Sequence, residues 1–155
     1  MIETTSNVPQ LEDPLALEQQ VCFALAVASR NVIGVYRPIL EPLGLTHPQY
    51  LVMLALWQHQ PLSVRRLSDM LQLEPATLSP LVKRLEAAGL LRREREPGNE
   101  RALALTLTEK GRQLREEALK VPPAVVSRLG MSIPELMDLH RVLTRVIAAT
   151  QPGGS

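Results

Sequence analysis

The sequence has one cysteine, Cys22, three histidines and few aromatic residues, which make up 3% of its 155 positions. A single cysteine excludes an internal disulfide, and the scattered histidines add no zinc-ligand spacing. No uncharged apolar run reaches the roughly 18 residues of a membrane-spanning helix. The segment 1–14 is polar and acidic, unlike a signal peptide. These absences predict a cytoplasmic protein with no metal site, no cofactor and no membrane segment.

The length and the 45% of hydrophobic residues support one domain, 1–155, with a core built mainly from leucine, valine and alanine. The net charge is only +1, but it is unevenly distributed. Residues 63–112 carry 10 basic and 7 acidic side chains, whereas residues 1–62 carry 2 and 5. A positive excess in the middle of the chain indicates where nucleic-acid phosphates would bind.

Residues 62–108 contain the most informative pattern. Ser63 suits the N-cap of a short helix with an apolar stripe formed by Val64, Leu67, Met70 and Leu71. Pro75 suits the first position of a second helix, which would bury Leu78, Leu81, Val82 and Leu85. Gly89 suits a left-handed C-cap. Two strands, 90–96 and 101–108, would then form a two-stranded hairpin around a turn at 97–99.

Helix, turn, helix and hairpin in this order predict a winged helix-turn-helix over residues 46–108, in a fold that is mainly α with a small β-hairpin wing. The second helix would enter the major groove, and Arg101 on the wing would enter the minor groove. An ordinary amphipathic helix with a solvated charged face is the alternative. The predicted DNA contacts are Ser63, Arg65, Thr77, Ser79, Pro80, Lys83, Arg84, Arg93, Arg95, Asn99 and Arg101.

Two flanking regions, about 14–45 and 109–149, are predicted to be helical and unusually apolar. The first would run as one long helix from Pro14, with a kink at Pro38. The second would break at 121–123 and resume at a capping box that begins with Ser132. Both have more apolar surface than one small domain can cover, which predicts that they form the interface of a homodimer.

The chain resembles the MarR family of winged-helix regulators, and within it the organic-hydroperoxide-sensing (OhrR) subfamily with one cysteine. The resemblance covers nearly the whole chain. It depends on the segments QVCFALAVASRNVIGVYRPILEPLGLTHPQYLVMLALW, TLSPLVKRLEAAGLLRRER and NERALALTLTEKG. It implies a homodimer that represses transcription from a palindromic operator and leaves that double-stranded DNA when organic hydroperoxide oxidises Cys22.

The resemblance also implies that Tyr36 hydrogen-bonds Cys22 of the partner subunit. Cys22 and Tyr36 are 14 residues apart in one predicted helix, about 21 Å along its axis, so they cannot touch within one subunit. Members usually carry two further tyrosines near the sulfur, where this chain has Ala26 and His47. His47 could donate an N–H, and as a cation it would favour thiolate. Asn99 replaces the aspartate usual in the wing.

Three functions remain open on the sequence. The first is the redox repressor, whose oxidised Cys22 would be resolved by a small external thiol or by Cys22 of the partner subunit. The second is a repressor released by a small aromatic or lipophilic ligand, with Cys22 a buried structural residue. The third, a thiol peroxidase, has no support beyond the thiol, because the nearest arginine, Arg30, lies two turns away. The chain is therefore expected not to be an enzyme.

Overall fold

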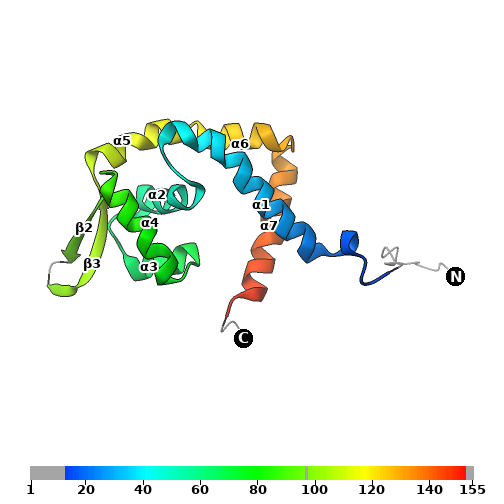
Figure 1. Ribbon diagram of the computed structural model, residues 1–155, viewed down its shortest axis with the longest axis horizontal. Coiled ribbons are helices and arrows are strands. Elements are labelled where there is room, and N and C mark those ends of the chain that lie inside the picture. Colours follow the sequence, from blue (N-terminus) through cyan, green and yellow to red (C-terminus); the bar gives the residue numbers. More distant parts are fainter. Residues whose placement is uncertain (1–12, 97, 153–155) are drawn as a thin grey trace.

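The computed structural model describes residues 13–96 and 98–152, so most of the polar segment 1–14 lies outside it. Figure 1 shows a head that contains α2, α3, α4 and the sheet, and an arch of helices, α1, α5, α6 and α7, that extends away from it. The elements, in chain order, are η1 (Leu17–Gln19), α1 (Val21–Leu40), η2 (Glu41–Leu43), α2 (His47–His59), β1 (Leu62–Ser63), α3 (Val64–Leu71), α4 (Pro75–Ala87), β2 (Leu91–Glu96), β3 (Asn99–Leu107), α5 (Glu109–Ala118), α6 (Val121–Leu129) and α7 (Ile133–Thr150).

Helix α2 lies at the centre of the head and packs against α3, α4 and β3. It begins at the predicted capping box, in which the Thr46 hydroxyl accepts from the Gln49 backbone N–H and the Gln49 side chain accepts from the Thr46 N–H. Because neighbours surround it on several sides, its apolar residues need no single stripe. The fully buried side chains of the core include Leu40, Val52, Met53, Leu56, Leu67, Leu78, Leu85, Leu91, Leu105 and Leu107.

The helix-turn-helix forms as the sequence predicts, with one error in the buried stripe. Ser63 caps α3 by accepting from the Arg66 N–H, and Pro75 begins α4. Met70, predicted to be buried, is 38% exposed, and Ser68 is buried in its place. The reason is a hydrogen bond that an apolar pattern cannot reveal: the Ser68 hydroxyl donates to the Leu73 carbonyl across the turn, where Gln72 is left-handed.

The predicted β-hairpin is confirmed in β2 and β3, and a third short strand that was not predicted, β1, extends it to a sheet in the order β1-β3-β2. Leu62 and Ser63 pair with Leu105 and Ala104 at the base of the hairpin. Two residues are too few to show the alternation that identifies a strand in a sequence. Of the leucines on one face of β3, Leu105 and Leu107 are buried, whereas Leu103 is 40% exposed because it lies beyond the core.

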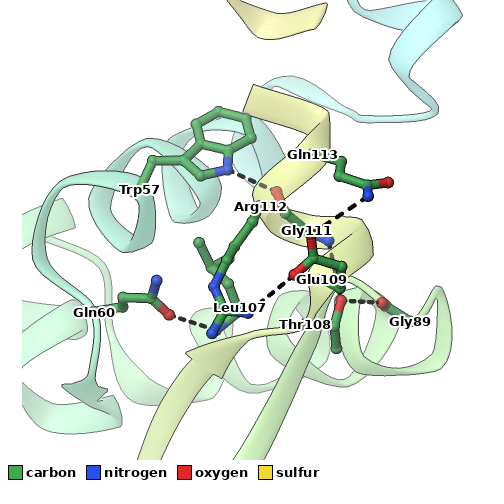
Figure 2. A network of polar contacts seen from close by, with 9 residues as sticks. All are labelled: Trp57, Gln60, Gly89, Leu107, Thr108, Glu109, Gly111, Arg112 and Gln113. Carbon is green, nitrogen blue, oxygen red and sulfur yellow. Dashed lines mark hydrogen bonds and ion pairs between the residues drawn. The ribbon is translucent and has the colours of Figure 1, made fainter. Parts of the chain in front are cut away.

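A network of hydrogen bonds joins the base of the wing to α2 and α5 (Figure 2). The Trp57 indole N–H donates to the Gly111 carbonyl over 2.9 Å, and the Gln60 side-chain carbonyl accepts from the Leu107 N–H over 2.9 Å. Thr108 caps α5 and donates from its hydroxyl to the Gly89 carbonyl. The wing therefore leaves the head from a fixed base.

The first long helix begins later than predicted. Helix α1 begins at Val21 and continues past Pro38 to Leu40, whereas residues 17–19 form the separate 3-10 turn η1. Gln20 between them is extended, with φ −79° and ψ 114°. Its side-chain amide donates to the carbonyls of Pro14 and Ala16, which satisfies the end of the preceding turn in place of a continuous helix.

The prolines at 122 and 123 separate α5 from α6, as expected, but they also lie in the first turn of a helix that the sequence analysis did not predict. Proline is tolerated there because the first N–H groups of a helix have no intrahelical partner. Helix α7 begins at the predicted cap, where the Ser132 hydroxyl accepts from the Glu135 N–H. The Glu135 carboxylate accepts from that same hydroxyl and not from the Ser132 backbone.

Helices α1 and α7 present much of the exposed apolar surface of the chain. Only Leu40 is buried in α1, and no residue is buried in α7. The large exposed hydrophobic side chains of these two helices are Val21, Phe23, Ile33, Ile133, Met137, Leu139, Val142, Val146 and Ile147. In the described part of the chain, no helix combines the length and the apolarity needed to cross a membrane.

Candidate nucleic-acid interface and thiol site

The outer face of α4 is a continuous polar surface. Its inner stripe is buried in the core, so the residues between the stripe positions point away from the head. All of the contacts predicted on this helix are exposed: Thr77, Ser79, Pro80, Lys83 and Arg84. Hydroxyl groups lie towards the start of the helix and two cations lie one turn further on. A surface with these groups can donate hydrogen bonds to phosphates and to guanine edges.

Helix α3 and its N-cap contribute two of the predicted contacts, Arg65 and Ser63, which differ in their freedom to bind. Arg65 is exposed on the first turn of α3. Ser63 is half-buried, and its oxygen already accepts from the Arg66 N–H over 3.1 Å. Its hydroxyl proton remains available to a phosphate, so Ser63 can cap the helix and donate to DNA at the same time.

The wing carries the remaining predicted contacts. Arg95 is exposed on β2, whereas Arg93 is held by the carboxylate of Glu86 on α4, with 2.9 Å between Arg93 Nη2 and Glu86 Oε1. Asn99 and Arg101 lie in β3 by their backbone, and their side chains are outside the described part of the structure. The arginines on the wing are therefore not equivalent, because Arg93 holds a carboxylate at 2.9 Å, whereas Arg92 lies 4.0 Å from the carboxylate of Glu94.

Cys22 is exposed at the second position of α1, on the apolar surface described above. Tyr36, the residue predicted to bind the sulfur, lies near the other end of that helix. Tyr36 packs against His47, with ring centroids 4.8 Å apart, and against Tyr50, at 5.8 Å. About 21 Å of helix separates Cys22 from Tyr36, so the structure brings Tyr36 and His47 together and leaves the sulfur apart from both.

Burial shifts the pKa values of the side chains in the aromatic cluster. It raises the pKa of Tyr36, and burial together with the neighbouring Tyr36 raises the pKa of Tyr50. Burial lowers the pKa of His47 below its usual 6.5. Burial therefore favours the neutral imidazole, which leaves His47 the hydrogen-bond donation that the sequence allowed and disfavours its cationic form. A neutral imidazole and two phenols can still donate hydrogen bonds to an anion.

An open cavity of about 570 Å³ lies beside this cluster, at the corner between α1 and α2. His47 lines it together with Ile33, Arg37 and Glu41. The sequence did not predict Arg37, Glu41 or Glu86 as site residues. The arginine-proline pair within the motif around Tyr36 was the only available signal for Arg37, whereas nothing local distinguishes Glu86 from a solvated acid.

The MarR family model matches residues 45–103, which include the helix-turn-helix and most of the wing. The chain is 38% identical over 131 residues to an organic hydroperoxide resistance transcriptional regulator of Bacillus subtilis, covering 84% of this chain and 89% of that protein.

Two solved structures extend the comparison. One is overoxidized AbfR bound to DNA, from Staphylococcus epidermidis, with 35% identity, a TM-score of 0.66, and coverage of 84% of this chain and 95% of that one. The other is CouR from Rhodococcus jostii RHA1 bound to p-coumaroyl-CoA, with 25% identity, a TM-score of 0.74, and coverage of 90% and 97%.

Proposed function

Because this chain belongs to the MarR family of transcriptional regulators, we propose that it is a homodimeric repressor which leaves a palindromic operator when organic hydroperoxide oxidises Cys22. It is a regulator and not an enzyme. The observation that carries the redox proposal is the exposed thiol of Cys22, the single cysteine of the chain, on an apolar helix face. A related regulator from Bacillus subtilis is named for organic hydroperoxide resistance, which supports the same signal.

DNA binding would use α4 in the major groove and the wing in the adjacent minor groove. The exposed hydroxyls and cations of α4 supply the donors, and the related AbfR has been solved on DNA. In a two-fold dimer, the two copies of α4 would have to lie about 34 Å apart to reach half-sites one helical turn apart. Operator palindromy then follows from the symmetry of the protein.

The dimer would bring Cys22 of one subunit to Tyr36 and His47 of the other. A hydrogen bond from Tyr36 or His47 would stabilise the thiolate, because donors to a charged form favour that form. Ala26 offers no hydroxyl, so this chain has fewer such donors than the subfamily pattern, and we expect slower oxidation for that reason.

The chemical step transfers one oxygen atom. The Cys22 thiolate attacks the distal peroxide oxygen, the O–O bond breaks, and the alkoxide takes a proton and leaves as an alcohol. Sulfur is oxidised to sulfenic acid and the peroxide is reduced. A small external thiol then condenses with the sulfenic acid to give a mixed disulfide and water. The bulkier sulfur adduct would no longer fit a packed interface, and the two recognition helices would lose their spacing.

The test compares wild type, Cys22→Ser and Tyr36→Phe on an operator selected by the wild-type protein from random duplexes. Fluorescence anisotropy is followed while cumene hydroperoxide is added, with and without a small thiol. Wild type should leave the DNA, faster with the thiol, and Tyr36→Phe should leave more slowly. Cys22→Ser should bind equally well and stay bound. If it leaves as readily as wild type, the redox proposal is wrong.

A second candidate is release by a small aromatic or lipophilic ligand. Two observations favour it: the cavity of about 570 Å³ beside His47, which Arg37 also lines, and the related CouR, which was solved with p-coumaroyl-CoA. In this case Cys22 would only contribute to packing. Blocking the thiol with iodoacetamide would then leave DNA binding unchanged, whereas small aromatic acids would release the operator.

A further inference from the structure

One carboxylate joins the recognition helix to the wing. Glu86, near the end of α4, accepts from three N–H groups of Arg93 on β2. The distances are 3.2 Å from the Arg93 backbone N to Oε2, 3.3 Å from Nε to Oε2, and 2.9 Å from Nη2 to Oε1. The carboxylate of Glu86 thus binds both the guanidinium and the backbone of Arg93. Together these bonds constrain the distance between α4 and β2 and also the angle between them.

This ion pair is the outermost connection between α4 and β2 among the bonds of the described residues. Closer to the core, the Leu90 N–H donates to the Leu85 carbonyl over 3.0 Å, and Gly89 makes the turn with φ +76°. From Arg93 towards the tip of the hairpin, β2 pairs with β3. Without the pair, the wing could tilt about the turn while its base remained in place.

We propose that Glu86 is a positioning residue, which through Arg93 sets the angle and spacing between the recognition helix and the wing. The inference rests on the proposed DNA-binding function and deepens it. It also reassigns Arg93, from a predicted phosphate contact to a residue that orients its neighbours. The acid and the base are each about one-third exposed, so the pair lies at the surface, between the proposed recognition helix and the wing.

Charge alone predicts the opposite effect of removing the acid. Glu86→Gln adds one positive charge next to DNA, which should strengthen binding to any duplex. A lost positioning contact should instead weaken binding to the operator, where helix and wing must enter their grooves together. The sign of the change in operator affinity therefore separates positioning from simple electrostatics.

The experiment measures the affinity of the full-length protein for its selected operator and for a scrambled duplex of the same length. Glu86→Gln should weaken operator binding about three- to tenfold and leave scrambled binding equal or tighter. Arg93→Lys keeps the charge but loses the fork, so it should show the same loss of operator affinity. Arg92→Lys is the matched control on the opposite face of β2, and it should bind as wild type does.

Several outcomes would overturn the proposal. Tighter operator binding by Glu86→Gln would show that its charge merely repels DNA. Full affinity of Arg93→Lys would show that Arg93 acts as a cation, either on phosphate or at long range. If wild type selects no duplex at all, the proposed DNA-binding function fails first, and the positioning role fails with it.

Discussion

Gly111 shows how a single position can be required for reasons that no local pattern reveals. It lies inside α5, where glycine is a poor helix former. A Cβ atom at this position would lie 2.1 Å from the carbonyl oxygen of Leu90 and 3.1 Å from its carbonyl carbon. The carbonyl of Gly111 also accepts a hydrogen bond from the Trp57 indole N–H. The close approach of α5 to the base of the wing therefore leaves room for glycine alone.

We expect Gly111→Ala to destabilise the protein by about 1–3 kcal/mol, because a backbone oxygen cannot move aside without displacing the chain around it. Urea unfolding followed by circular dichroism measures the change. Gln113→Ala, on the exposed side of the same helix, should stay within about 0.5 kcal/mol of wild type. Equal stability of the two variants would show that α5 can shift away from Leu90.

Helix α4 and the wing are the two elements that the proposed DNA binding would use together. The helix is fixed by its buried stripe and the wing by the bonds of Trp57, Gln60 and Thr108 at its base. The arginines on β2 differ in their surroundings, because Arg93 pairs with Glu86 whereas Arg95 lies nearer the tip of the hairpin. The proposed positioning role of Arg93 would remove it from the phosphate contacts of the wing.

Arg101→Ala should weaken binding to all DNA sequences, because the proposed contact is ionic and does not read base identity. The slope of log affinity against log salt should become shallower by about one unit. Fluorescence anisotropy from 50 to 200 mM salt, about the range over which such slopes are read, is the measurement. Lys120→Ala, far from the wing, is the control. An unchanged slope for Arg101→Ala would mean that Arg101 does not touch DNA.

The exposed apolar surface of α7 supports the proposed homodimer. Helix α7 has no buried residue, and Leu139, Val142 and Ile147 on it are each more than two-fifths exposed. An apolar surface of this kind is unfavourable in water unless a partner covers it. The proposed dimer would cover it and would also bring Cys22 to the aromatic cluster of the other subunit.

Leu139→Glu should therefore convert the dimer to monomer and abolish operator binding, because it would bury a charge without a counterion in the interface. Arg141→Glu, on the opposite side of α7, should leave the dimer intact. Sedimentation velocity at micromolar protein gives the mass of each variant. A dimeric Leu139→Glu variant that still binds DNA would show that the interface lies elsewhere.

The sequence by itself determined the helix-turn-helix, because its signals are local. The caps at Thr46, Ser63 and Ser132 act within one turn of helix, and Pro75 and Gly89 restrict their own backbone. The apolar stripe of α4 was likewise readable from its spacing. The exposed faces that carry the proposed DNA contacts and Cys22 follow from the same periodicity.

Only the tertiary structure decided features that join distant or very short segments. Strand β1 exists because Leu62 meets Leu105, and the pair of Glu86 and Arg93 forms because β2 folds back along α4. The lowered pKa of His47 comes from burial beside Tyr36, which its neighbours in the chain cannot indicate. In each case the deciding energy comes from a contact across space, so a pattern along the chain carries no trace of it.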